Sequence, residues 1–403
     1  MIGLETELAV GDPYPAPPPG GGGAGPAPFR VHVSDEVLQD LHRRLGDTRW
    51  PDSIPGSGWE HGTDVDYLRS LAAEWAGRFD WRAQEDLLAA CLPSWQVALD
   101  GLSVHYDRLE GKGPDPFPLV LLHGWPGSYF EMYKIAPALA DPAAHGGRAE
   151  DAFHVVVPSL PGHGFSGIPP VTGFGADECA DVVRQLMVDV LGFARFGAQG
   201  GDRGAFVANG LGHRHRDAVA GIHLNFAGGI VGEGDELTDA ERRWLADREQ
   251  WLQTEGGYIA IQGTRPQSLS FGLNDSPAGL LAWIVDKWRA WSDCAGDVER
   301  CFTRAELLTN ATLYWVTGTI RSSMHYYWEH RVRPPVAVRP QRVDVPTAVA
   351  VFPREVLPPP RSAAARKYDL RRWTEFPRGG HFAAMEQPDA LVEDIRAFFR
   401  DFR

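Results

Sequence analysis

The segment AQGGDRGAF, residues 198–206, places Asp202 among glycines where a predicted strand meets a predicted helix. Such an elbow needs glycines because the turn leaves no room for side chains, and hydrolytic folds use it to expose a nucleophile. A carboxylate is already ionised at neutral pH, so Asp202 could attack without activation by a base. An aspartate here could instead serve only as a helix N-cap. Because glycines flank Asp202 on both sides, we favour the nucleophile.

The segment HGWPGS, residues 123–128, directly follows the apolar run PLVLL. A strand that ends in His-Gly-x-Pro can turn the amide of the x residue, here Trp125, toward the elbow. With the backbone N–H of Arg203, this amide would form an oxyanion hole. A simple turn after the strand would explain the His-Gly and Pro-Gly pairs separately. It would not explain why they occur where the fold needs backbone N–H donors for an oxyanion hole.

The segment RGGHFAAMEQP near the C-terminus exposes His381 after two glycines. A histidine in this place acts as general base in the chain order nucleophile, acid, base. The acid should follow the preceding strand, TAVAVFPREVL, where Glu355 is the one carboxylate. Asn225, after the strand that follows the elbow helix, is the other position for an acid, but an amide cannot supply the charge. Glu355 as a plain surface glutamate is the alternative.

The elements that must position these residues alternate along the chain. After a hairpin turn at Asp100-Gly101, short apolar runs are separated by helical segments. Runs that are apolar throughout predict a mostly parallel sheet with helices on both faces, the α/β-hydrolase type of architecture. From Asn225 to about Gln341 the strand signal disappears, and the segment reads as helical and rich in tryptophan.

A helical insertion between two strands of such a sheet indicates a cap over the edge that binds ligands. Within it, Ser276 and Pro277 form an N-cap and N1 pair, and further upstream Ser34 is the expected N-cap of an early helix. We divide the chain into a flexible Pro/Gly-rich tail (1–28), an N-terminal helical segment (29–92), a core in two parts (93–228 and 341–403) and a helical cap (229–340).

Taken together, these segments resemble the epoxide hydrolases of the microsomal and juvenile-hormone type, within the α/β-hydrolase superfamily. The resemblance extends from Phe29 to the C-terminus. The family usually has tryptophan at position 203, where this chain has arginine, a change that keeps the backbone donor but alters the pocket or the pKa of the carboxylate. The motifs that carry the resemblance are TRWPD, HGWPGS, PSLPGHGFSG, GGDRG, LNDSP, LTNATLYWVTGTIRSS, FPREVL and RGGHFAAMEQP.

The resemblance implies two cap tyrosines, which map onto Tyr258 and onto Tyr327, with the adjacent Tyr326 left open for the second. It implies conversion of an epoxide to a vicinal diol through an ester on Asp202, which water activated by His381 and Glu355 then hydrolyses. No metal or organic cofactor is needed. A haloalkane dehalogenase, another hydrolase with an aspartate nucleophile and, less favoured, a non-catalytic binder are the alternatives.

Composition limits the partners. The formal net charge of −14 argues against nucleic acid and against an anionic membrane surface. No signal peptide or membrane-spanning run is recognised, and the anchoring helix of the microsomal members is not found, so we expect a cytoplasmic, bacterial-style relative. The four scattered cysteines predict neither a zinc site nor a disulfide framework. The expected partner is a small-molecule epoxide, with a bulky aromatic group favoured by the cap tryptophans, and a homodimer is left open.

Overall fold

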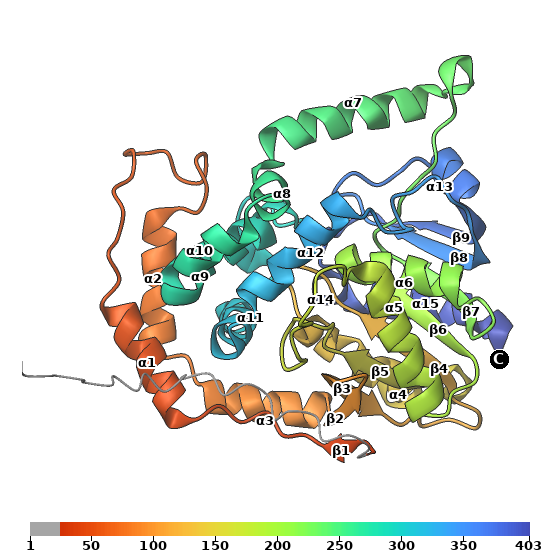
Figure 1. Cartoon of the computed structure of the whole chain (residues 1–403), viewed down its shortest axis with the longest axis horizontal. Helices are drawn as coiled ribbons and strands as arrows, with labels where there is room; N and C mark the ends of the chain where they lie inside the picture. Colours follow the sequence, from red (N-terminus) through yellow and green to blue (C-terminus); the bar gives the residue numbers. More distant parts are fainter. Residues whose placement is uncertain (1–24) are drawn as a thin grey trace, which may run out of the picture.

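A nine-stranded sheet forms the centre of the protein, whose computed structural model describes residues 25–403 apart from the side chain of Asp235. Its strands are β1 (Ala27–Pro28), β2 (Ser94–Leu99), β3 (Leu102–Leu109), β4 (Phe117–Leu122), β5 (Phe153–Pro158), β6 (Phe196–Gly200), β7 (Val219–Leu224), β8 (Val343–Val351) and β9 (Tyr368–Glu375). They lie in the order β1-β2-β3-β5-β4-β6-β7-β8-β9 (Figure 1). The pairs from β5 through β9 are parallel, and those among β1, β2, β3 and β5 are antiparallel. The predicted mostly parallel α/β-hydrolase sheet is therefore confirmed.

Both faces of the sheet are buried, which explains why its strands are apolar throughout. Leu119 and Leu121 of β4 belong to one hydrophobic cluster, whereas Val120 and Leu122 belong to the other. Alternate residues of a strand point to opposite faces, so each face needs its own cover. The first cluster includes side chains of α4 (Ala136–Ala140) and α15 (Pro388–Phe399), and the second includes those of α5 (Ala176–Arg184) and α6 (Asp202–Arg214).

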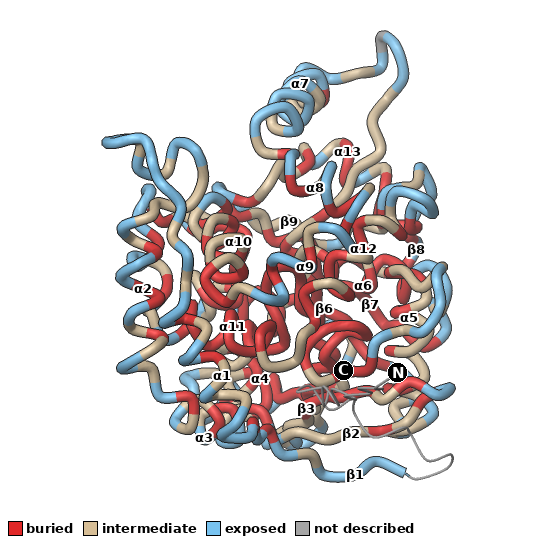
Figure 2. Tube along the Cα trace, turned by 60° about the vertical axis from the view of Figure 1, so that its left-hand side comes forward, coloured by how far each residue is buried: buried red, intermediate tan, exposed pale blue. Residues whose placement is uncertain are grey.

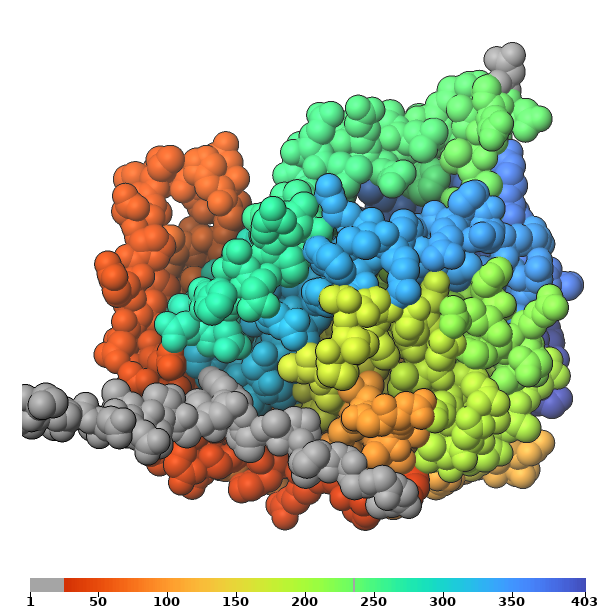
Figure 3. Space-filling view, in the orientation of Figure 1, coloured from red at the N-terminus to blue at the C-terminus, as the bar shows by residue number. Residues whose placement is uncertain are grey.

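The segment between β7 and β8 is helical. It contains η5 (Gly234–Glu236), α7 (Asp239–Thr254), α8 (Gly257–Gln262), α9 (Pro266–Asp275), α10 (Pro277–Ala290), η6 (Val298–Arg300), α11 (Arg304–Thr317) and α12 (Ile320–Val332). Figure 3 shows α7 and the helices after it lying over the core, and Figure 2 shows α7 as the exposed outer member. Apolar residues of α8, α10, α11 and α12 are buried, so this segment shares one hydrophobic cluster with the core.

Three N-terminal helices pack against this segment. They are α1 (Asp35–Gly46), α2 (Val65–Gly77) and α3 (Trp81–Cys91). The indole N–H of the fully buried Trp75 donates a hydrogen bond of 2.9 Å to the hydroxyl of Thr312 in α11. The remaining short elements are η1 (Tyr129–Lys134), η2 (Pro142–His145), η3 (Ala149–Asp151), η4 (Gln185–Val190), α13 (Arg361–Lys367), α14 (Ala383–Glu386) and η7 (Arg400–Phe402).

Local signals in the sequence agree with these elements, with one correction at the N-terminal end. The side chains of Ser34 and Ser276 cap α1 and α10, and Asp100 and Gly101 form the predicted turn with positive φ angles of 49° and 81°. Residues 1–24 of the predicted tail lie outside the described part of the chain. Ala27 and Pro28, also assigned to the tail, pair with β2 instead, because that edge of the sheet offers free backbone groups.

Candidate active site

Asp202 stands in the elbow between β6 and α6 with a φ of +44°, a strained conformation for a residue with a side chain. The neighbouring glycines are required by contact. A Cβ on Gly200 would lie 2.4 Å from the backbone of Gly204, and a Cβ on Gly204 would lie 1.9 Å from the carbonyl oxygen of Leu122. The elbow thus presses α6 against β4 and leaves the carboxylate of Asp202 at the carboxyl end of the sheet, where such folds bind ligands.

The loop after β4 brings a backbone donor to this carboxylate. The N–H of Trp125 donates a hydrogen bond of 2.8 Å to Oδ1 of Asp202. Gly124 allows this approach, because a Cβ there would lie 2.5 Å from the Cβ of Asp202. The N–H of Arg203 belongs to the first turn of α6, whose amides have no acceptor inside the helix. Of the two backbone groups predicted for the oxyanion hole, the N–H of Trp125 thus contacts Asp202 directly, and the N–H of Arg203 is the next amide along the chain from Asp202.

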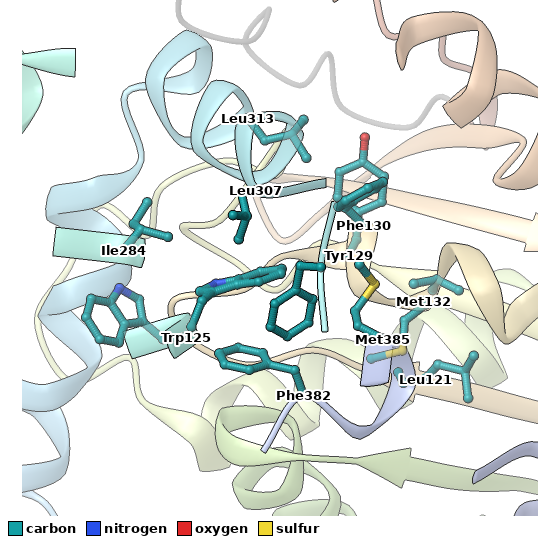
Figure 4. Packing of buried hydrophobic residues seen from close by; sticks show 14 of the residues in the cluster. Leu121, Trp125, Tyr129, Phe130, Met132, Ile284, Leu307, Leu313, Phe382 and Met385 are labelled. Atoms are coloured by element: carbon teal, nitrogen blue, oxygen red, sulfur yellow. The ribbon is translucent and has the colours of Figure 1, made fainter. Parts of the chain in front are cut away.

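The indole of Trp125 fills the space beneath the inserted helices and holds this loop in place. It is fully buried and belongs to the same hydrophobic cluster as Tyr129, Phe130 and Phe382 (Figure 4). Burial of a side chain this large contributes several kcal/mol on the scale of about 25 cal/mol per Å². A rigid loop keeps its amide aimed at Asp202 without reorganisation during a reaction.

His381 lies between two carboxylates. Its Nδ1 is 2.5 Å from Oε1 of Glu355, and its Nε2 is 3.6 Å from Oδ2 of Asp202. Both neighbouring loops are joined by a parallel bridge between Arg354 and Gly380, which sets Glu355 beside His381. Asn225, the other position considered for an acid, instead accepts a hydrogen bond of 2.8 Å from the side chain of Gln199.

The charges of this triad reinforce one another. Burial disfavours a charge on His381, but Glu355 and Asp202 outweigh this effect and raise the pKa of His381 well above its usual value. Burial also opposes the charge of Asp202, yet hydrogen bonding and attraction by His381, together with Arg203 and the Trp125 amide, lower the pKa of this carboxyl. At neutral pH Asp202 is therefore ionised, and His381 beside it is protonated.

Two tyrosines from the inserted helices face Trp125 and each other. Tyr258 of α8 stacks on Trp125 with ring centroids 5.6 Å apart, and Tyr327 of α12 meets the same indole edge-on at 5.5 Å. The centroids of the two phenol rings are 5.6 Å apart. Burial raises the pKa of both hydroxyls, so both phenols are protonated at neutral pH and can donate a proton or a hydrogen bond.

Tyr326 points to the other side of α12. Its hydroxyl donates to the carbonyl oxygen of Pro161 at 2.8 Å and lies 2.6 Å from Sγ of Cys179. Neither Pro161 nor Cys179 belongs to the site around Asp202, so the hydroxyl of Tyr326 is bonded away from that site. The structure thus separates the two adjacent tyrosines that the sequence left open.

The sequence left open whether the side chain of Arg203 alters the pocket or the pKa of the carboxylate. This arginine is 5% exposed, and its guanidinium carbon lies 3.7 Å from the ring centroid of Tyr327. Nη1 is 3.3 Å from Nδ1 of His330, whose pKa falls to about 3 because of burial and the charge of Arg203. His330 is therefore neutral and accepts from the guanidinium. A desolvated cation on an aromatic face is worth about 2 kcal/mol and holds this ring in place.

A residue that the sequence analysis did not consider is Glu131 of η1, which is 8% exposed and lines a small cavity together with Asp202 and His381. The signal was present in HGWPGSYFE, where an acidic residue interrupts a buried aromatic run. Over residues 25–403, no cluster of three or more His, Cys, Asp or Glu side chains is arranged to hold a metal ion. In the same part of the chain, none of the helices combines the length and apolar character that a membrane crossing requires.

The sheet, the elbow and the triad together define an α/β-hydrolase with an aspartate at the nucleophile position. Comparison with known proteins agrees: residues 118–257 match the family described as "alpha/beta hydrolase fold", and residues 26–132 match "Epoxide hydrolase N terminus". The chain is 36% identical over 401 residues to epoxide hydrolase 1 of Oryctolagus cuniculus, covering 92% of this chain and 88% of the rabbit protein. This chain belongs to the epoxide hydrolase family.

Further relatives support the same assignment. A protein of the same family from Stigmatella aurantiaca is 41% identical over 379 residues, which cover 93% of this chain and 85% of the relative. The solved structure of the Aspergillus niger epoxide hydrolase superimposes with a TM-score of 0.82 at 33% identity, covering 94% of this chain and 97% of that one. The predictions of fold, family and hydrolase activity are confirmed.

Proposed function

We propose that this enzyme opens its epoxide by attack of Asp202, forms an ester and then hydrolyses that ester to release a vicinal diol. The observation that carries the proposal is the placement of Asp202. Its Oδ1 accepts from the Trp125 amide, its Oδ2 faces His381, and two protonated phenols lie across the same indole. This arrangement supplies a nucleophile, an acid and a base in one site.

In the first step, Oδ2 of Asp202 attacks an epoxide carbon and forms the ester bond. The ring C–O bond breaks, and its electron pair stays on the oxygen, which takes a proton from Tyr258 or Tyr327. Oδ1, already in the oxyanion hole, becomes the carbonyl oxygen of the ester. Loss of the charge on Asp202 removes one of the two groups that raise the pKa of His381, so this histidine can give up its proton while the phenol regains one.

In the second step, water attacks the ester carbon while neutral His381 accepts the proton of that water. The charge that develops on Oδ1 is stabilised by the backbone N–H groups of Trp125 and Arg203. The bond between the ester carbon and the alkyl oxygen then breaks, and this oxygen takes the second proton of the attacking water from the new hydroxyl group on Asp202. The diol leaves, and Asp202 as a carboxylate and protonated His381 are restored. Glu355 keeps Nδ1 of His381 protonated, so that Nε2 is the nitrogen that accepts.

A single turnover in water enriched in oxygen-18 tests this scheme. Because water attacks the ester carbon, the new oxygen remains on Asp202, and enzyme in excess should become labelled while the first diol stays unlabelled. Peptide mass spectrometry locates the label, and Asp202→Asn, which removes the nucleophile, is the control that should not alkylate. Label in the first diol instead would show direct attack of water on the epoxide.

We further propose that residues 229–340 act as the cap and that the epoxide carries a bulky aromatic group. An open cavity of about 790 Å³ beside the site is lined by Trp244, Trp251 and Trp291 together with Glu355. Trp251 and Trp291 also pack against Tyr258. In the single-turnover experiment, styrene oxide should therefore alkylate Asp202 faster than an aliphatic epoxide of similar length. A cytoplasmic location and a homodimer stay predictions from the sequence.

Replacing Arg203 tests its contact with Tyr327. Arg203→Leu removes the cation from the face of the Tyr327 ring. In the native enzyme this cation stabilises the phenolate that forms as the proton leaves. We expect the alkylation rate to fall roughly tenfold to a hundredfold, in line with a desolvated cation–π contact of about 2 kcal/mol. Rapid-quench kinetics should show ester hydrolysis within a few-fold of native. An equal loss in both steps would assign Arg203 to general support of the site.

A further inference from the structure

A small cavity beside Asp202 and His381 has no role in the steps derived above. Its volume is about 20 Å³, and its lining includes Asp202, His381, Glu131, Gln199 and Asn225. A site needs about 10–15 Å³ and two to four polar partners to hold one water molecule. This cavity meets both conditions beside the carboxyl carbon that becomes the ester.

Glu131 is the residue that gives the cavity a polar wall. Its side chain is almost completely buried, and its Oε1 has no hydrogen-bonding partner within residues 25–403. Gly127 makes room for it, because a Cβ at that position would lie only 1.6 Å from this oxygen. A buried oxygen without a partner costs about 1–3 kcal/mol or more, so its retention calls for a ligand.

The electrostatic surroundings keep this carboxyl neutral. Burial raises the pKa of Glu131 to about 8, although the charge of His381 opposes this rise more strongly than the charge of Asp202 adds to it. A neutral carboxyl group can both donate and accept a hydrogen bond. Across the cavity, the amide N–H of Gln199 is bonded to Asn225, whereas its Oε1 has no partner in the described residues. The two side chains offer complementary groups to one bound water.

We propose that Glu131 is the water-positioning residue of ester hydrolysis, which binds one water molecule in this cavity, between Asp202 and His381, with help from Gln199. The proposal rests on the two-step reaction above. The oxygen of the bound water forms a bond to the ester carbon, and one of its protons goes to Nε2 of His381. The bond between the ester carbon and the alkyl oxygen then breaks, whereas the bond between this oxygen and the alkyl carbon is kept. Glu131 retains its own proton throughout and fixes the direction of attack.

Four variants separate this role from packing. Glu131→Leu removes both polar atoms, and Glu131→Gln keeps a neutral donor and acceptor in a similar volume. Gly127→Ala leaves Glu131 in the chain but displaces its carboxyl group by contact. Met385→Leu is the packing control. Met385 of α14 is buried in the same hydrophobic cluster as Phe130 and Met132 of η1, but it does not line the cavity. For each variant, rapid-quench measurements with styrene oxide give the rates of alkylation and of ester hydrolysis separately.

We expect Glu131→Leu and Gly127→Ala to slow ester hydrolysis by about tenfold to a hundredfold, with alkylation within about threefold of native, so that the adduct accumulates. Glu131→Gln should recover most of the hydrolysis rate, and Met385→Leu should match native enzyme. Equal losses in both steps, or native hydrolysis in Glu131→Leu, would overturn the role. If the variants fail to fold, a high-resolution crystal structure of native enzyme decides, since it must show a water bonded to Oε1 of Glu131. Adduct formation by native enzyme tests the two-step reaction independently of Glu131.

Discussion

In the variant His381→Ala, a stable adduct on Asp202 should accumulate and turnover should stop after one equivalent of substrate. Alkylation needs the charge of Asp202 and the phenols, and the Trp125 amide still favours that charge in the variant. Hydrolysis needs a base for water, and a positioned general base is worth a factor on the order of 10² to 10⁴. Intact-mass spectrometry should show a shift equal to the mass of the epoxide, because no atoms leave during ring opening.

The control for this experiment is a histidine outside the site. His154 on β5 also lies close to a carboxylate, with its Nδ1 2.8 Å from Glu110. His154→Ala should keep both rates and show no adduct at steady state. A folded His381→Ala enzyme without adduct would mean that His381 acts before or during alkylation, and the base assignment would be wrong.

The second large effect concerns the phenols of Tyr258 and Tyr327. Each change to phenylalanine keeps the ring that packs on Trp125 but removes the proton needed by the leaving oxygen. The alkylation rate should fall by a factor on the order of 10² to 10⁴ in each single variant. The double variant should be nearly inactive. Ester hydrolysis, which uses the His381 side of the site, should stay close to native in rapid-quench experiments.

Tyr326→Phe is the matched control, because it is adjacent in sequence but faces the core. It loses the hydrogen bond to the carbonyl of Pro161, which should reduce the free energy of unfolding by about 1 kcal/mol and leave alkylation nearly unchanged. Denaturant titration measures the first effect and rapid quench the second. A severe loss of alkylation in Tyr326→Phe, with a mild one in Tyr327→Phe, would reverse the assignment of the two residues.

The local patterns of the sequence were sufficient for the fold and for the part of the site that lies on the sheet. Apolar runs alternating with helices predicted the parallel sheet, because a strand covered on both faces must be apolar on both. Asp202, Trp125, Glu355 and His381 each follow a strand at its carboxyl end. Parallel strands end at one edge, so the chain order of these segments already implied that the structure would bring the four residues together.

The contacts that the inserted helices make could not be predicted from the sequence in the same way. Which of Tyr326 and Tyr327 faces Asp202 depends on how α12 is rotated against the core, and a one-residue step turns a helix by about 100°. The side chain of Arg203 could have pointed to solvent, and its place under Tyr327 is set by a helix more than a hundred residues away in the chain. Glu131 lines a cavity with Gln199 and His381 only because the folded chain places η1 beside segments that are remote in sequence.

The sheet, the elbow and the order of the triad could therefore be predicted from the chain alone, because each depends on short-range patterning and on the geometry of parallel strands. The faces of α8 and α12, the pairing of β1 with β2, and the charge states of Glu131 and His381 depend on the folded arrangement. Burial and the distance to other charges set a pKa, and both quantities arise from contacts between segments remote in sequence. Secondary-structure periodicity carries no information on such contacts.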